Sequence, residues 1–156
     1  MKTNALRLLD AASIHYETVT YKVDETDLSA MHVAAQLGED IACVFKTLVL
    51  RGDKTGVFVC IIPGDNEVDL KKAAKASRNK SCAMTKMQEL LPLTGYIRGG
   101  CSPIGMKRAY PMFINESCLA LSHIYISAGC RGMQVRLATT DLISFANLTI
   151  ADLCSK

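Results

Sequence analysis

The sequence predicts a single α+β domain over residues 1–156, built from a mixed β-sheet and short helices. Its 156 residues, 49% hydrophobic and 21% charged, suffice for one buried core and are too apolar for a disordered chain. No internal repeat and no linker rich in Pro, Gly or Ser divides the chain. Strand and helix patterns interleave without the regular βαβ alternation of a doubly wound fold, and this observation decides the class.

The first half of the chain predicts two helices, one strand and a hairpin. Ala5, Leu8, Leu9 and Ala12 share one face of a helix near the N-terminus. A segment of alternating polarity then predicts a strand, and an apolar helical pattern ends at Gly38, the expected cap. Two β-rich runs around a glycine-containing turn predict the hairpin. These segments are the strand at 16–23, the helix at 29–37, and the hairpin strands at 44–50 and 57–62.

The second half predicts three short helices and three strands. A helix over 69–76 begins at Asp69 and carries lysines on its outer face. We expect Pro92 to stop a second helix over 86–91, because proline removes a helical hydrogen bond. A loop follows at about 95–105. The remaining segments are strands at 112–114, 124–127 and 133–137 and a helix at 140–146.

Charge and cysteine content exclude several classes of function. The formal net charge of +3 neither requires nor excludes an RNA partner. The seven cysteines form no Cys-x-x-Cys pair and no Cys–His pair at ligand spacing, so we expect no metal, cofactor or disulfide framework. The N-terminus lacks a signal-peptide pattern, and no apolar run approaches about 18 residues. With reduced thiols, these features predict a cytoplasmic protein without a membrane partner.

The stretch from Arg98 to Gly105, RGGCSPIG, is the first candidate site. Its three glycines allow backbone amides to approach a ligand closely, and Pro103 stiffens the loop. Such amides suit a carbonyl, carboxylate or phosphate oxygen. The alternative is a plain connecting loop, since Gly and Pro are the usual turn residues. Cys101 is an unfavoured nucleophile, because nothing in the sequence marks a base for it.

Two further positions are candidates. Lys46 lies in an apolar strand, where alternation places it on one face with Val44 and Leu48. Lys46 either belongs to a functional site or lies at the edge of the sheet and extends its ammonium group to water. Ser127 ends a strand before the glycine turn SAGCRG, where it either binds a ligand or forms the turn. The three histidines lie in no recognisable motif, and hydrolase, P-loop and dinucleotide fingerprints are absent.

Basic residues gather in two places. One group lies on or just after the helix over 69–76, and another follows the glycine loop. They form a solvated surface or contact a phosphate backbone near the pocket. We take as candidate contacts with a nucleic-acid backbone Lys71, Lys72, Lys75, Arg78, Lys107 and Arg108.

Four motifs in order along the chain resemble one family. They are FKTLV at 45–49, DLKKAA at 69–74, TGY at 94–96 with GGCSPIG at 99–105, and SAGCRG at 127–132. The chain resembles the YbaK/EbsC family of Cys-tRNA(Pro) deacylases, which are related to the editing insertion domain of bacterial prolyl-tRNA synthetase. The similarity extends over essentially the whole chain.

The resemblance implies a curled, partly barrel-like mixed sheet with helices around it. It also implies hydrolysis in trans of the ester that joins a wrong amino acid to tRNA(Pro). The implied partners are tRNA(Pro) charged with cysteine and prolyl-tRNA synthetase in a ternary complex, and neither DNA nor a membrane. No cofactor is implied.

The resemblance also distributes roles. Lys46 matches the family's essential lysine, and the 99–105 loop matches the segment that cradles the substrate. We expect catalysis to involve Lys46 and the backbone of Gly99, Gly100, Cys101 and Ser102. We expect substrate binding by Tyr21, Leu28, Thr47, Pro103, Ser127, Gly129 and Gln134. Three positions depart from the family pattern: Leu28 replaces an aromatic residue of some relatives, Cys130 a basic residue, and Gln134 a carboxylate.

The missing base suggests a hypothesis for the mechanism. A cysteinyl ester carries its own thiol, and positioned intramolecular reactions reach effective molarities of about 10⁵–10⁸ M. The protein then needs only to orient the ester and stabilise the developing oxyanion with loop amides. Lys46 would bind the phosphate or ribose end or stabilise the leaving oxygen. The alternatives are a deacylase that prefers another small amino acid and a non-catalytic module that binds tRNA or the synthetase.

Overall fold

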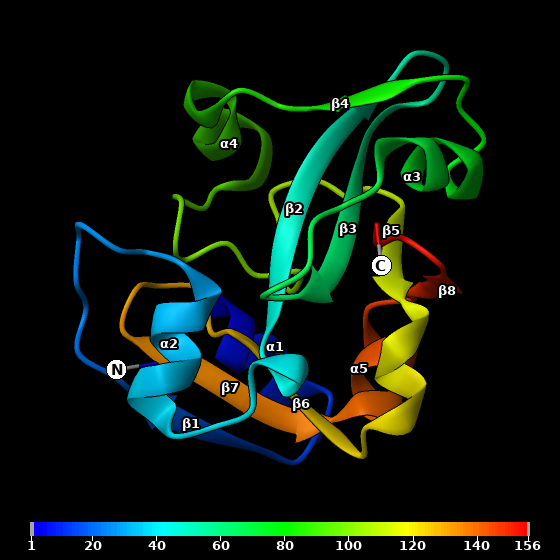
Figure 1. Cartoon of the computed structure of the whole chain (residues 1–156). Coiled ribbons are helices and arrows are strands. Elements are labelled where there is room, and N and C mark those ends of the chain that lie inside the picture. The colour runs from blue at the N-terminus through cyan, green and yellow to red at the C-terminus, as the bar shows by residue number, and fades with distance from the viewer. Residues whose placement is uncertain (1, 156) are drawn as a thin grey trace.

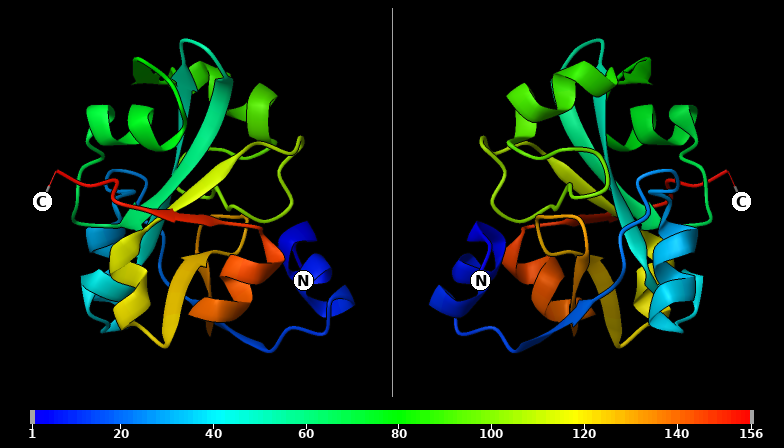
Figure 2. Two further views of the ribbon diagram at one scale, coloured as in Figure 1. Left: turned by 90° about the vertical axis from the view of Figure 1, so that its right-hand side faces the viewer. Right: turned by 90° about the vertical axis from the view of Figure 1, so that its left-hand side faces the viewer.

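The computed structural model describes residues 2–155, which form one α+β domain (Figure 1). Its helices lie around two β-sheets (Figure 2). The α-helices are α1 (Asn4–Ala11), α2 (Ala30–Leu37), α3 (Leu70–Ala76), α4 (Met87–Thr94) and α5 (Thr139–Phe145), with 3₁₀ turns η1 (Ile41–Cys43) and η2 (Glu116–Ala120). The strands are β1 (Tyr16–Thr20), β2 (Phe45–Gly52), β3 (Gly56–Pro63), β4 (Cys82–Met84), β5 (Met112–Asn115), β6 (His123–Ser127), β7 (Met133–Ala138) and β8 (Thr149–Ala151).

The strands divide into two sheets. The larger has the order β4-β2-β3-β5-β8, antiparallel from β4 to β3 and parallel from β3 to β8. The smaller is antiparallel, with the order β1-β7-β6. A single parallel bridge between Val44 and Tyr125 connects them. The mixed α+β class is therefore confirmed. The expected single curled sheet is replaced by two sheets, because the segment leading into β2 shares only this isolated bridge with β6 and no continuous ladder joins the two among residues 2–155.

The main core lies between the two sheets. Phe45 and Val49 of β2 pack with Ile126 of β6, Val135 of β7 and Leu9 of α1. On the other face of β2, Leu48 and Leu50 belong to a second core under α3. This burial confirms the predicted alternation of β2.

Several predicted boundaries change. Pro92 lies inside α4, which continues to Thr94 and ends at Gly95 in the left-handed conformation. The last turn is held from outside, since the Tyr110 hydroxyl donates to the carbonyl of Leu93 at 2.6 Å. The strand expected over 16–23 ends at Thr20. Leu6, not Leu8, is buried on α1. Strands β4 and β8 are three residues each, too short to show alternation in a sequence.

Candidate functional site

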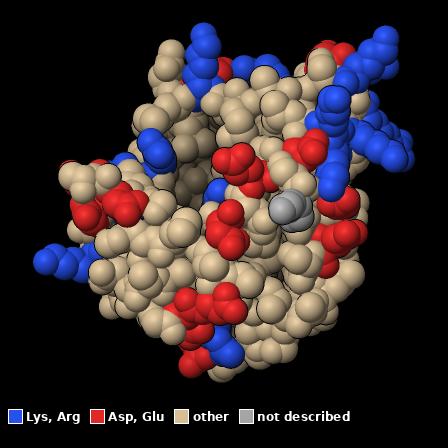
Figure 3. All heavy atoms as spheres, in the orientation of Figure 1, with Lys and Arg blue, Asp and Glu red and all other residues tan. Residues whose placement is uncertain are grey.

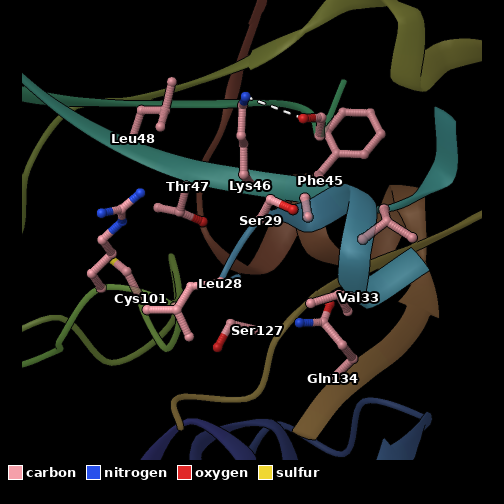
Figure 4. A pocket seen from close by; sticks show the side chains of 15 residues that line it. Leu28, Ser29, Val33, Phe45, Lys46, Thr47, Leu48, Cys101, Ser127 and Gln134 are labelled. Atoms are coloured by element: carbon pink, nitrogen blue, oxygen red, sulfur yellow. Dashed lines mark hydrogen bonds between the residues drawn. The ribbon is translucent and has the colours of Figure 1, made fainter. Parts of the chain in front are cut away.

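A cavity of about 340 Å³ opens beside the first half of β2. Its walls come from five places: the start of α2 with the two residues before it, residues 44–48, Gly64 after β3, the glycine loop, and the facing ends of β6 and β7. Figure 3 shows the hollow from outside, and Figure 4 shows its side chains. Three sequence motifs that lie far apart in the chain therefore meet at one cavity.

The open edge of β2 explains why a cavity forms here. The amide of Gly64 donates to the carbonyl of Val44 at 2.8 Å, so even-numbered residues of β2 bond to β3. In an antiparallel pair the odd-numbered residues then direct their peptide groups the other way. Strand β4 pairs with β2 only from Leu50 onward. The peptide N–H and C=O of Thr47 thus point to an edge that no strand covers among residues 2–155.

Lys46, the residue of β2 before Thr47, also lines the cavity. Its side chain is partly buried, and Nζ donates to the carbonyl of Gly64 at 3.2 Å (Figure 4). Burial lowers the pKa of Lys46, while Glu67 and, more weakly, Asp65 act in the opposite direction. An ammonium group has three donors. Two protons of Lys46 are therefore available for a ligand.

The glycine loop begins with a tight turn. The amide of Gly100 donates to the carbonyl of Ile97 at 3.0 Å, and Gly99 has φ +85°. A positive φ at the third position is typical of a type II turn and requires glycine. The hydroxyl of Tyr96 donates to the carbonyl of Ile104 and closes the loop. The amide of Gly100 already donates within the turn and cannot also donate to a ligand oxygen. Of the three amides at positions 99–101, those of Gly99 and Cys101 therefore remain as candidate donors to an oxyanion.

Cys101 lines the cavity, but its thiol is not activated. Burial raises the pKa of the Cys101 thiol to about 11, and a hydrogen bond with Thr94 opposes this only in part. A thiol with this pKa remains protonated at neutral pH and is a poor nucleophile. The Cys101 thiol is therefore not a candidate nucleophile.

Ser127 and Gln134 face each other across β6 and β7 and both line the cavity. The oxygen of Ser127 accepts from the amide of Gly129 at 3.1 Å, which leaves its O–H free to donate. Gln134 is 5% exposed, and its Oε1 is buried without a hydrogen-bond partner. An unpaired buried acceptor is costly, which suits a ligand that supplies the donor.

The predicted site residues divide into two sets. Those that line the cavity are Leu28, Lys46, Thr47, Gly99, Cys101, Ser127 and Gln134. The others support it or lie elsewhere. Ser102 is fully buried and accepts from the amide of Ile104, Gly100 packs behind the loop, and Gly129 bonds to Ser127. Tyr21 packs beside α2, and Pro103 lines a separate cavity.

Sequence reasoning gave no role to two lining residues: Arg98, which opens the first candidate stretch, and Gly64. Arg98 stands exposed at the entrance, directly before the glycines. Gly64 accepts from Lys46, and a side chain here would meet Cβ of Ala30 at 2.3 Å. The available signals were a basic residue next to an anion-binding loop and a Pro-Gly pair after a strand, both of which also occur in ordinary turns.

The candidate tRNA contacts do not line the cavity. Lysines of α3 gather at the upper right of Figure 3, whereas carboxylates flank the hollow. Lys72 bonds to Asp152 and to the carbonyl of Cys154. Arg108 lines the same separate cavity as Pro103, and the amide of Lys107 donates to the carbonyl of Thr94. The two basic groups therefore lie in different parts of the molecule.

Two structural findings bear on other classes of function. Within residues 2–155, no three His, Cys, Asp or Glu side chains gather as ligands of a metal would. None of the helices described here has the length and apolar character needed to cross a bilayer.

Comparison with known proteins identifies the class. Residues 25–145 match the aminoacyl-tRNA editing domain, the class that this fold and site define. The chain belongs to the YbaK/EbsC family within it. It is 46% identical over 155 residues to the candidate Cys-tRNA(Pro)/Cys-tRNA(Cys) deacylase EbsC of Enterococcus faecalis, a match that covers 99% of this chain and 94% of that protein.

Solved structures share the fold. The hypothetical protein APE2540 superimposes with a TM-score of 0.89 at 18% identity, covering 98% of this chain and 100% of its own. A structure described as a candidate trans-editing enzyme for prolyl-tRNA synthetase gives a TM-score of 0.85 at 22% identity, covering 100% of both chains.

Proposed function

We propose that this protein deacylates, in trans, tRNA(Pro) that carries cysteine. The observation that carries the proposal is the composition of the cavity wall. Among residues 2–155, the charged side chains of the wall are Lys46 and Arg98, and its neutral polar side chains are Ser29, Thr47, Ser127 and Gln134. The described wall has a glycine turn but no histidine or carboxylate, and burial raises the pKa of its Cys101 thiol to about 11. Such a site can position an ester and stabilise charge, but it lacks an activated nucleophile of its own. The name of the 46% identical relative supports the same substrate.

The substrate's thiol supplies the missing nucleophile. Its sulfur attacks the ester carbonyl, a C–S bond forms, and the C–O bond to the ribose breaks. The thiol proton ends on the departing ribose oxygen, and water then opens the resulting thiolactone to free cysteine. Positioning alone supports such a step, since effective molarities of intramolecular reactions reach about 10⁵–10⁸ M.

The cavity provides groups for each part of this reaction. In this proposal the amides of Gly99 and Cys101 stabilise the oxyanion, and the Lys46 ammonium stabilises the departing ribose oxygen; the support is that all three residues line the cavity. The unpaired Oε1 of Gln134 accepts from the α-ammonium group of the amino acid. The free O–H of Ser127 completes this polar end.

Prolyl-tRNA synthetase is the proposed source of tRNA specificity. Few basic side chains surround the cavity, and carboxylates flank it (Figure 3). Because phosphate contacts dominate affinity for nucleic acids, this surface alone supports only weak tRNA binding. A ternary complex with the synthetase in the cytoplasm would supply the rest.

The test is hydrolysis of Cys-, Ala-, Ser- and Pro-tRNA(Pro), with and without prolyl-tRNA synthetase. We expect rapid release of cysteine and little release of proline, and we expect the synthetase to raise the rate at low tRNA concentration. Lys46→Ala should abolish release, whereas Lys75→Ala on exposed α3 should not. Faster release of alanine or serine would identify a different preference. If the wild-type protein bound the charged tRNA but released no amino acid, it would be a non-catalytic binding module.

A further inference from the structure

A second cavity of about 310 Å³ adjoins the first. It lies between the glycine loop and the segment formed by β4 and α4. The two cavities share part of their walls, at Thr47, Leu48, Arg98, Gly99 and Cys101. A ligand can therefore extend from one cavity into the other past Thr47 and Arg98.

The walls of the second cavity are mainly apolar. Met84 and Met87 are 46% and 63% exposed, and Leu90 lies beside them. Methionine side chains are flexible and polarisable, and they make favourable contacts with aromatic rings. Large exposed apolar side chains that converge on a cavity typically mark a binding surface. This wall is therefore suited to a flat aromatic group.

The junction between the cavities is polar. The uncovered peptide groups of Thr47 face it from β2, and the exposed residue Arg98 lines both cavities. Lys86 adds a second positive charge on the side of the methionines. Asp65 and Glu67, whose charges act on Lys46, follow Gly64, which lines the first cavity but not the second. A phosphate is therefore favoured beside Arg98 and Lys86 and disfavoured beside these carboxylates.

This order of surfaces matches the order of groups in an aminoacyl ester of a nucleoside. A small polar amino acid is followed by an ester, a ribose with hydroxyls and phosphate, and a base. We propose that the second cavity binds the purine base of the terminal adenosine, between Met84, Met87 and Leu90, with the ribose at Thr47 and Arg98. This inference rests on the proposed function and adds a subsite to it.

The test compares two small substrates, cysteinyl adenosine and cysteine methyl ester. We expect wild-type protein to cleave the adenosine ester with the higher kcat/KM. The double variant Met84→Ala/Met87→Ala should lose about tenfold in kcat/KM on the adenosine ester and keep its rate on the methyl ester, since stacking contacts contribute this order of affinity. Leu91→Ala is the control, because Leu91 is 52% exposed on the same helix but does not line the cavity. Equal loss on both esters, or no preference in the wild type, would overturn the inference.

A binding measurement separates the subsite from the reaction. Adenosine 5′-monophosphate is titrated into wild-type protein, and the methionine methyl signals are followed by NMR. Shifts of Met84 and Met87 without shifts of Met31, which is 61% exposed on α2, support the subsite even if no ester is cleaved. Shifts at none of the three, or equally at all three, would contradict it even if cysteine is released.

Discussion

The guanidinium of Arg131 donates a hydrogen bond to the carbonyl of Arg98, with Nε 2.8 Å from the oxygen. This bond joins the turn after β6 to the start of the glycine loop. Behind it, a side chain on Gly100 would meet backbone atoms of Cys130 and Arg131 at 3.2 Å. The loop that lines the cavity is therefore fixed by close contact with the second glycine turn, and both turns act as one structure.

This contact predicts the effect of Gly100→Ala. The added methyl group must push two backbone segments apart, which costs about 1–3 kcal/mol of stability and moves the amides of Gly99 and Cys101. We expect deacylation to fall at least tenfold, measured at a temperature where the variant is folded. Gly56→Ala is the control, since its φ of +78° makes alanine costly while open space surrounds it in the distant β2–β3 turn. Equal activity of the two variants would show that the contact does not position the loop.

Lys46 should titrate below the ordinary lysine range. Burial lowers the pKa of Lys46 and Glu67 partly restores it, so Glu67→Gln should lower that pKa further. The pKa of Lys72 is raised, mainly by its hydrogen bond to Asp152, which makes it the internal control. Reductive methylation with ¹³C and NMR titration can follow both groups. A Lys46 pKa at or above that of Lys72 would contradict the structure.

The same shift has a consequence for stability. Between the folded and unfolded pKa of Lys46, the unfolded chain binds more protons, so the free energy of unfolding contributed by this group rises with pH. Lys46→Met should remove this rise, as measured by urea denaturation at several alkaline pH values.

Cys101 should be dispensable for the reaction. Burial raises the pKa of its thiol to about 11, so the thiol stays protonated at neutral pH. We expect Cys101→Ala to retain deacylation within about threefold, because the backbone amide remains and a protonated thiol is a weak nucleophile. A loss as large as that of Lys46→Ala would instead identify the thiol as a reacting group.

We predict that Gln134 lowers the stability of the fold and contributes to substrate binding. Its Oε1 is buried without a partner, so Gln134→Leu should raise the free energy of unfolding by about 1 kcal/mol while raising KM for the cysteinyl ester. Gln36→Leu, on the exposed part of α2, should change neither quantity. Lower stability of Gln134→Leu, or an unchanged KM, would mean that this amide serves the fold and not the substrate.

Much of the fold was predictable because its signals are local. The alternation of β2, the hairpin and the helix ending at Gly38 follow from spacing and turn residues. The position of Pro92 inside α4 could not be predicted from local signals. The last turn of this helix is held by Tyr110, which belongs to a distant segment. The division into two sheets likewise depends on where β2 and β6 meet, which no local pattern encodes.

The site residues could likewise be predicted only where a local sequence pattern marks them. Lys46, Gly99 and Ser127 stand out because their residue types are unusual in their local patterns. Gly64 and the methionine wall look like ordinary turn and surface residues, and only tertiary contacts bring them to the cavities. The basic helix α3 is the converse case, a conspicuous pattern that folds away from the cavity.

The most direct test of the account is a single-turnover comparison of Cys-tRNA(Pro) with the same tRNA carrying S-methylcysteine. In the proposed mechanism the substrate's free thiol starts the reaction, because the wall described among residues 2–155 has no histidine or carboxylate and the pKa of its Cys101 thiol is raised. We expect the free thiol ester to be cleaved at least about a hundredfold faster, because blocking the thiol removes the intramolecular attack. Equal rates for the two esters would contradict substrate-assisted cleavage.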